Sequence, residues 1–164
     1  MLGNTLQPRH AKPEVFISRT LVDELISICV LALPHKAFGL VGGTDIHHPK
    51  SFYPCSTNLR NTPEWKPVFE SFGDFYLNSD LGFVISAPEV KSVLESMASR
   101  RESLVGVFHS HRFLPAKPSK ADVALNSNPT LLCYIVSLVD SSNPEVGVFG
   151  LNGGKYQDIT IVNF

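Results

Sequence analysis

The stretch VGVFHSHRFLPAKPSKAD, residues 105–122, decides how this chain folds and what chemistry it can carry. Its first part alternates between apolar and other residues and predicts a central strand over residues 104–111. Residues two apart on a strand project to the same face, so His109 and His111 point the same way. Ser119 opens a short helix predicted over residues 119–126, and Asp122 follows it by about one turn.

These three side chains have the donor types of a metal site. Two neighbouring imidazoles can share one metal ion at about 2.0–2.1 Å per bond, and Asp122 can supply a third ligand. Three protein ligands leave a fourth position for water, which is typical of a catalytic zinc site, and zinc lowers the pKa of that water toward about 7. Each half of the pattern also has a structural interpretation, as two hydrogen-bonded histidines and as a capping-box variant. The joint pattern is rarer than either half, so we predict a zinc site.

The rest of the chain predicts an α+β domain, with helices packed on a mostly antiparallel or mixed sheet. A first helix begins at Ser18 or Thr20 and ends at Pro34, and a second begins at the capping box of Ser86 and Glu89 and ends near residue 101. Further strands are predicted over residues 14–17, 37–43, 83–85, 131–139, 146–151 and 156–162.

Residues 44–82 lose the periodic pattern and predict a long loop insertion. The stretch holds four prolines and many aromatic residues. A loop of this length inside a compact domain is usually functional. Its aromatic side chains line a binding groove or cover the core. His47 and His48 lie within it, and we expect both to be solvated rather than part of a second site.

Length and composition bound the function. A chain of 164 residues with 43% hydrophobic residues fits one domain, residues 1–164, with one core. The formal net charge of −1 offers no basic stripe, so nucleic acid is not an expected partner. No apolar run is long enough to span a bilayer, and the first ten residues lack the order of a signal peptide. A cytoplasmic location is expected, with the three cysteines as free thiols.

His-x-His, seven residues and then Ser-x-x-Asp resembles the signature of the JAMM metalloproteases, also called the MPN-plus or Mov34/MPN/PAD-1 family. The flanking VGVFHSH and the early Gly39-Leu-Val-Gly are similar to that family as well. The resemblance covers residues 16–162 and implies a cytidine-deaminase-like mixed β-sheet flanked by helices. Compact single-domain members are usually bacterial or archaeal.

The resemblance also implies an activity. Such members resemble peptidases that trim the C-terminal tail of a ubiquitin-like sulfur-carrier protein, and eukaryotic relatives are deubiquitinating isopeptidases. His109, His111 and Asp122 match the zinc ligands. Ser119 matches the residue that helps hold the oxyanion, an interaction worth on the order of 3 kcal/mol.

The chain departs from the family at Lys36, which stands where the general-base glutamate is expected. An ammonium repels a dication and cannot accept a proton. Three explanations are open. Lys36 is neutral and acts as the base; or His35 or a loop carboxylate replaces it; or the protein binds metal and partner but catalyses little. The loop carboxylates considered are Glu64, Glu70 and Asp74.

Two other functions compete with a peptidase acting on a ubiquitin-like tail. One is a catalytically impaired binding or scaffold module of the same fold, which Lys36 favours. The other is a deaminase-like zinc hydrolase, which is disfavoured because the chain has no Pro-Cys-x-x-Cys and no His-x-Glu.

Overall fold

The computed structural model describes residues 13–73, 82–125 and 128–164. A six-stranded sheet has the order β3-β2-β4-β5-β6-β7, and a separate two-stranded parallel sheet pairs β1 with β8. In the larger sheet β4 and β5 run parallel, and every other neighbouring pair is antiparallel. The predicted α+β class with a mixed sheet flanked by helices is therefore confirmed.

The strands are β1 (Glu14–Ile17), β2 (Phe38–Asp45), β3 (His48–Pro54), β4 (Ser103–His111), β5 (Leu132–Ser137), β6 (Glu145–Asn152), β7 (Lys155–Asp158) and β8 (Thr160–Asn163). The helices are α1 (Arg19–Leu31), α2 (Lys66–Glu70), α3 (Ala87–Ser99) and α4 (Lys120–Leu125), with a 3₁₀ turn, η1, at Leu59–Asn61. No helix among the described residues is long and apolar enough to cross a membrane.

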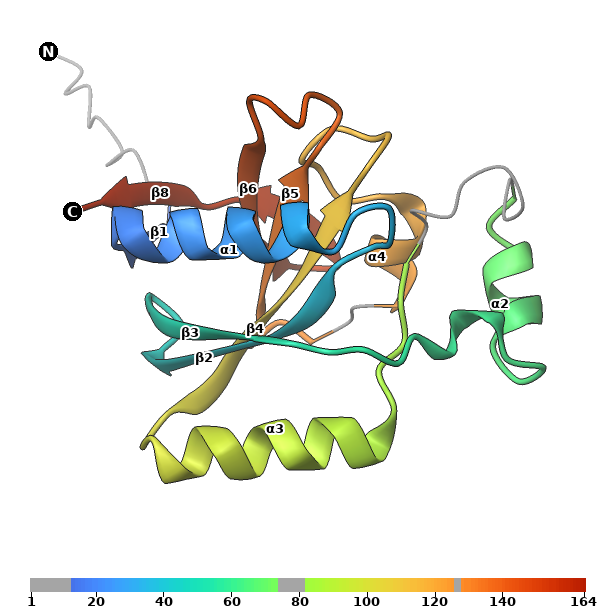
Figure 1. The fold of residues 1–164 in the computed structure, drawn as a ribbon, viewed down its shortest axis with the longest axis horizontal. Helices are drawn as coiled ribbons and strands as arrows, with labels where there is room; N and C mark the ends of the chain where they lie inside the picture. Colours follow the sequence, from blue (N-terminus) through green and yellow to red (C-terminus); the bar gives the residue numbers. More distant parts are fainter. Residues whose placement is uncertain (1–12, 74–81, 126–127) are drawn as a thin grey trace, which may run out of the picture.

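The two long helices lie on opposite sides of the large sheet (Figure 1). Helix α1 buries Leu21, Leu25 and Cys29, one residue per turn, against the face of the sheet that carries Phe108 and Tyr134. Helix α3 contacts β2 and β4 from the other side. Because side chains alternate along a strand, His109 lies on the face opposite Phe108 and its apolar core.

Both long helices begin where the sequence predicts. The Ser18 hydroxyl accepts a hydrogen bond from the Leu21 N–H at 3.2 Å, and the Ser86 hydroxyl accepts one from the Glu89 N–H at 3.4 Å. The carboxylate of Glu89 accepts hydrogen bonds from the N–H groups of Ser56 (2.6 Å) and Thr57 (3.3 Å). This acidic residue therefore ties α3 to the segment that follows β3.

Strand β4 occupies the middle of the sheet, between β2 and β5. The parallel pairing sets Gly106 opposite Leu132 and His109 opposite Ile135. A Cβ at Gly106 would lie 2.5 Å from the Leu132 carbonyl oxygen, so only glycine permits this approach. The histidine-bearing end of β4 is thus supported by a neighbour on each side.

The prediction of an irregular loop from residue 44 was wrong for most of the described part. Residues 48–54 form β3, and η1 and α2 follow. Pro49 and Pro54 near its ends obscured the strand, but β3 is an outer strand, where proline is tolerated because it removes no ladder hydrogen bond from a neighbour. The part of this stretch at residues 74–81 lies outside the described residues.

Two predicted strands also differ. Residues 83–85 make only an isolated bridge, between Ile85 and Asn58. The strand predicted over residues 156–162 is divided at Ile159 into β7 and β8, which belong to different sheets. Ile159 is buried and its N–H donates to the Val148 carbonyl at 2.8 Å, so packing against β6 turns the chain there.

Candidate metal centre

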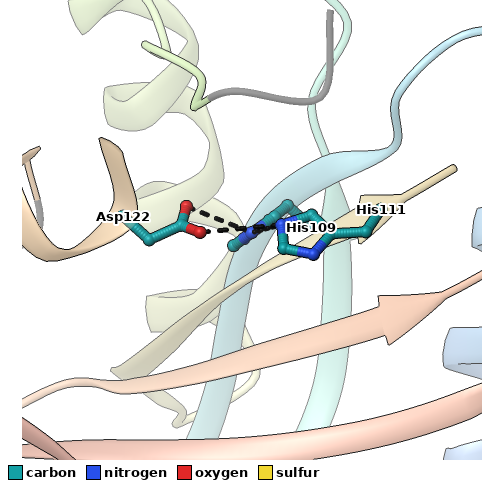
Figure 2. A group of neighbouring side chains, drawn as sticks. All are labelled: His109, His111 and Asp122. Atoms are coloured by element: carbon teal, nitrogen blue, oxygen red, sulfur yellow. Dashed lines mark hydrogen bonds and ion pairs between the residues drawn. The ribbon is translucent and has the colours of Figure 1, made fainter. Parts of the chain in front are cut away.

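His109, His111 and Asp122 form one buried cluster at the end of β4 (Figure 2). The two histidines project from the same face of β4, and Asp122 reaches them from the first turn of α4. Both histidines are fully buried, and Asp122 is 5% exposed. Polar and charged side chains that are buried this deeply need polar partners. Here the three side chains are partners of one another.

The separations of the donor atoms fit one small cation. The Nε2 atoms of His109 and His111 are 3.1 Å apart. Oδ1 of Asp122 lies 3.2 Å from Nε2 of His109, and its Oδ2 lies 3.6 Å from Nε2 of His111. Ligands at about 2.0–2.1 Å from a tetrahedral ion stand about 3.3–3.4 Å from one another. The observed separations bracket that value, so these residues can hold a metal.

A hydrogen bond from the far side of the ring orients His111. Its Nδ1 lies 2.8 Å from the Pro115 carbonyl oxygen, which can only accept. Nδ1 therefore carries the proton and Nε2 presents its lone pair to the cluster, as a metal ligand requires. Nδ1 of His109 has no hydrogen-bond partner within the described ranges, and its ring lies 5.3 Å from that of Phe83.

Ser119 holds Asp122 in place. The Ser119 hydroxyl and its backbone N–H both donate to Oδ2 of Asp122 at 2.7 Å, and the Asp122 N–H lies 3.3 Å from the same hydroxyl oxygen. The serine therefore caps α4 and orients the carboxylate at once. In this arrangement its hydroxyl proton is directed at Asp122, so the predicted oxyanion role requires the hydroxyl to turn.

The protonation states suit a metal site. Burial lowers the pKa of His109 from 6.5 to about 4, and the nearby charge of Lys36 acts in the same direction. Burial opposes ionisation of Asp122, but the two histidines and Lys36 hold the pKa of this carboxyl below its usual range. At neutral pH the cluster therefore presents a neutral His109 imidazole and a carboxylate, the forms that bind metal.

Lys36 lies beside the cluster. Its Nζ donates a hydrogen bond of 2.9 Å to the carbonyl oxygen of Ser110, the residue between the two histidines. Its charge also lowers the pKa values of His109 and Asp122. Lys36, which stands where the resemblance predicts the general-base glutamate, therefore lies next to the candidate ligands.

Among the described residues, none of the other candidate bases joins the cluster. His35 is exposed and lines the same cleft as Lys36. Glu64 is exposed, and Glu70 lies 3.8 Å from Lys66 on α2. Within the described ranges, neither glutamate belongs to the group of converging ligand atoms. Asp74 falls outside the described residues.

Sequence reasoning missed two features around the cluster. Cys133 is buried and lines a cavity of about 150 Å³ together with His109, Asp122 and Phe83. Arg60, on η1, is buried and lines a second cleft together with Lys36. Both depend on long-range packing, and no spacing in the chain indicates either.

Comparisons with known proteins place the fold. A family model described as prokaryotic homologs of the JAB domain, Prok-JAB, matches residues 18–148. A search of curated proteins found no match. Among solved structures, the chain is similar to a protein from Desulfitobacterium hafniense, with 24% sequence identity, a TM-score of 0.70 and 92% of each chain covered.

Two further solved structures have the same fold. A protein from Salinibacter ruber shares 20% identity with a TM-score of 0.60, covering 92% of this chain and 91% of that one. A structure described as JAMM, a metalloprotease-like zinc site in the proteasome and signalosome, shares 14% identity with a TM-score of 0.50, covering 92% and 98%. Since the family model spans most of the sequence, including the whole His109–His111–Asp122 cluster, this chain belongs to the Prok-JAB family, the prokaryotic JAB/MPN domains.

Proposed function

We propose that this chain is a zinc-dependent peptidase or isopeptidase that hydrolyses a bond at the C-terminal tail of a ubiquitin-like, sulfur-carrier type protein. The observation that carries the proposal is that two imidazole nitrogens and one carboxylate converge, with separations of 3.1, 3.2 and 3.6 Å between their donor atoms. Membership of the Prok-JAB family and a fold shared with a structure described as a metalloprotease-like zinc site support it. A cytoplasmic location is part of the same proposal.

Each residue of the centre has a task. Zinc held by His109, His111 and Asp122 supplies Lewis acidity toward a carbonyl and a water nucleophile at neutral pH. Pro115 keeps His111 in the tautomer that offers Nε2. Ser119 orients Asp122 and, by turning its hydroxyl, can donate to the oxyanion of the substrate carbonyl.

The substrate reaches this centre as an extended tail. A Gly-Gly tail has no side chains to grip, so backbone hydrogen bonds along a sheet edge suit it. The cavity bounded by His109, Asp122 and Phe83 lies directly beside the candidate ligands and is mainly apolar, with Val107 and Leu125 among its walls. It offers space for the side chain of a residue next to the scissile bond.

A second candidate function is a binding or scaffold module with impaired catalysis. The observation that favours it is Lys36, which brings an ammonium to within hydrogen-bonding distance of the strand that carries both histidines. An ammonium there cannot take a proton from water, and losing a general base typically costs about 10²–10⁴-fold in rate.

The two functions are separated by zinc analysis combined with a cleavage assay. The zinc-loaded protein is incubated with carrier proteins ending in Gly-Gly extended by one residue or by a peptide, and the products are weighed by mass spectrometry. Cleavage that His109→Ala abolishes and His48→Ala leaves intact supports the peptidase. Stoichiometric zinc without cleavage of any extended tail supports the module. A protein that binds no zinc when supplied with excess metal contradicts the peptidase.

A further inference from the structure

A second cleft lies beside the metal centre and is strongly basic. It has a volume of about 380 Å³, and Lys36, Arg60, Arg112 and His35 line it together with Asn58 and Asn61. We name it the basic cleft. At the Ser56 wall the carboxylate of Glu89 is held by the N–H groups of Ser56 and Thr57.

Three of its cations are fixed in place. Lys36 Nζ donates to the Ser110 carbonyl at 2.9 Å, and the guanidinium of Arg112 donates to the Pro34 carbonyl. The guanidinium of Arg60, a residue only 5% exposed, lies 5.5 Å from the centre of the Phe69 ring. Side chains that are already ordered lose less conformational entropy when they bind an anion, so this arrangement favours binding.

The basic cleft adjoins the metal centre through the chain itself. Lys36 reaches the backbone between His109 and His111, and Arg112 directly follows His111. Phe38, another wall of the basic cleft, pairs with His109 in the register of β2 and β4. A substrate group that binds in this cleft is therefore close, within the substrate, to the bond that the metal centre holds.

Arginine and lysine together favour a carboxylate as the bound group. A guanidinium can bind both oxygens of a carboxylate through two parallel N–H donors, and an ammonium adds a point charge. The two asparagines add neutral hydrogen-bonding groups to the same walls. Lys36 then helps to bind the substrate carboxylate. A glutamate in its place would repel that carboxylate, because both carry a negative charge.

We propose that the basic cleft binds a carboxylate of the substrate close to the scissile bond and so determines which tails are cleaved. This inference rests on the proposed function, because only a peptidase has a scissile bond. Binding of the carboxylate can nevertheless be tested separately from cleavage. The carboxylate has two sources in a peptide: the free α-carboxylate of a single trimmed residue, or an acidic side chain beside the cleaved bond.

The experiment uses the zinc-loaded protein and three fluorescein-labelled peptides that share one tail. The first ends Gly-Gly-Ala with a free carboxylate, the second is the same peptide as a C-terminal amide, and the third ends Gly-Gly-Asp as an amide. Affinity is measured by fluorescence anisotropy and cleavage by mass spectrometry. We expect at least one carboxylate peptide to bind about tenfold or more tightly than the Gly-Gly-Ala amide, with a preference that weakens as salt rises.

Two variants locate the effect. Arg112→Gln is expected to remove most of the preference for the carboxylate, whereas Lys91→Gln, on the exposed face of α3, leaves it unchanged. Preference for the first peptide over the third identifies the α-carboxylate as the ligand, and the reverse identifies the side chain. If Arg112→Gln does not fold, the preference and its salt dependence in the unaltered protein decide the question.

The outcomes separate this inference from the proposed function. Equal binding of all three peptides, or a preference that Arg112→Gln leaves intact, overturns the basic cleft as a carboxylate site even if cleavage is observed. Tighter binding of a carboxylate peptide without cleavage of any peptide supports the basic cleft and counts against the peptidase.

Discussion

The hydroxyl of Ser119 donates a 2.7 Å hydrogen bond to Oδ2 of Asp122, the oxygen that faces His111 across 3.6 Å. One residue thus begins α4 and aims the carboxylate that the metal centre requires. Removing the hydroxyl should weaken zinc binding even though serine is not itself a ligand. Substitutions of residues that orient metal ligands typically cost about 10–100-fold in metal affinity.

Ser119→Ala is therefore expected to lower zinc affinity by about tenfold or more, and to lower the free energy of unfolding of the metal-free protein by about 1 kcal/mol through the lost cap. Competition with a chelating dye measures the first quantity, and urea denaturation measures the second. Ser86→Ala is a matched control because Ser86 caps α3 away from the centre. It should reduce stability alone. Equal zinc affinity in both variants would show that Ser119 only caps its helix.

Lys36→Glu restores a carboxylate beside the metal centre. If lack of a base limits the reaction, this variant should cleave a Gly-Gly tail faster than the unaltered protein, by about 10²-fold or more. The same assay with Lys36→Gln removes the positive charge without supplying a base, so it separates the two effects. A rate unchanged by the glutamate would mean that another group already accepts the proton.

Metal removal should destabilise the folded state. A ligand that binds only the folded protein stabilises it by about 2.7 kcal/mol when present at 100 times its dissociation constant. Zinc should therefore raise the melting temperature of the chelator-treated protein, and His109→Ala should show no such rise. Differential scanning fluorimetry with and without zinc measures it. His48→Ala, at the far end of β2 and β3, should respond like the unaltered protein.

The stability of the metal-free protein should depend on pH because of His109. Its pKa is about 4 in the folded chain and 6.5 ordinarily, so the unfolded chain binds more protons between these values. The contribution to stability is complete above about pH 6.5 and is lost as the pH falls toward 4. Asp122, whose pKa is also lowered, acts in the same direction at lower pH. Urea denaturation in chelator at pH 7.5 and pH 5 measures the change.

His109→Gln should flatten that pH profile, whereas His35→Gln, a substitution at an exposed histidine, should preserve it. An identical fall in stability for all three proteins would assign the pH dependence to other groups.

Local patterns account for what the sequence could predict. Ser18 and Ser86 cap helices through residues three positions away, and the alternation that defines β4 lies within a single strand. Spacing alone predicted that His109, His111 and Asp122 would meet, because the strand and the helix that carry them are close in sequence. The placement of Lys36 depended on the family resemblance, and the structure sets it beside the same strand.

Features that depend on distant pairing were not predictable. The break at Ile159 arises because its N–H bonds to Val148 while the next N–H, that of Thr160, bonds to Pro13. The two halves of one apolar run therefore join separate sheets. Arg60 reaches the basic cleft only because η1 folds against the rest of the chain. No residue near it in sequence indicates that a buried arginine would lie there.

The two prolines of β3 affect how molecules meet in solution. An outer strand normally exposes N–H groups that a strand of another molecule can use, and this is a common route to aggregation. Pro49 and Pro54 have no N–H to offer, and Lys50 adds a charge between them. A strand of another molecule that pairs with the edge of β3 can form only a short ladder of hydrogen bonds. The prolines therefore protect concentrated protein from edge-to-edge aggregation at β3.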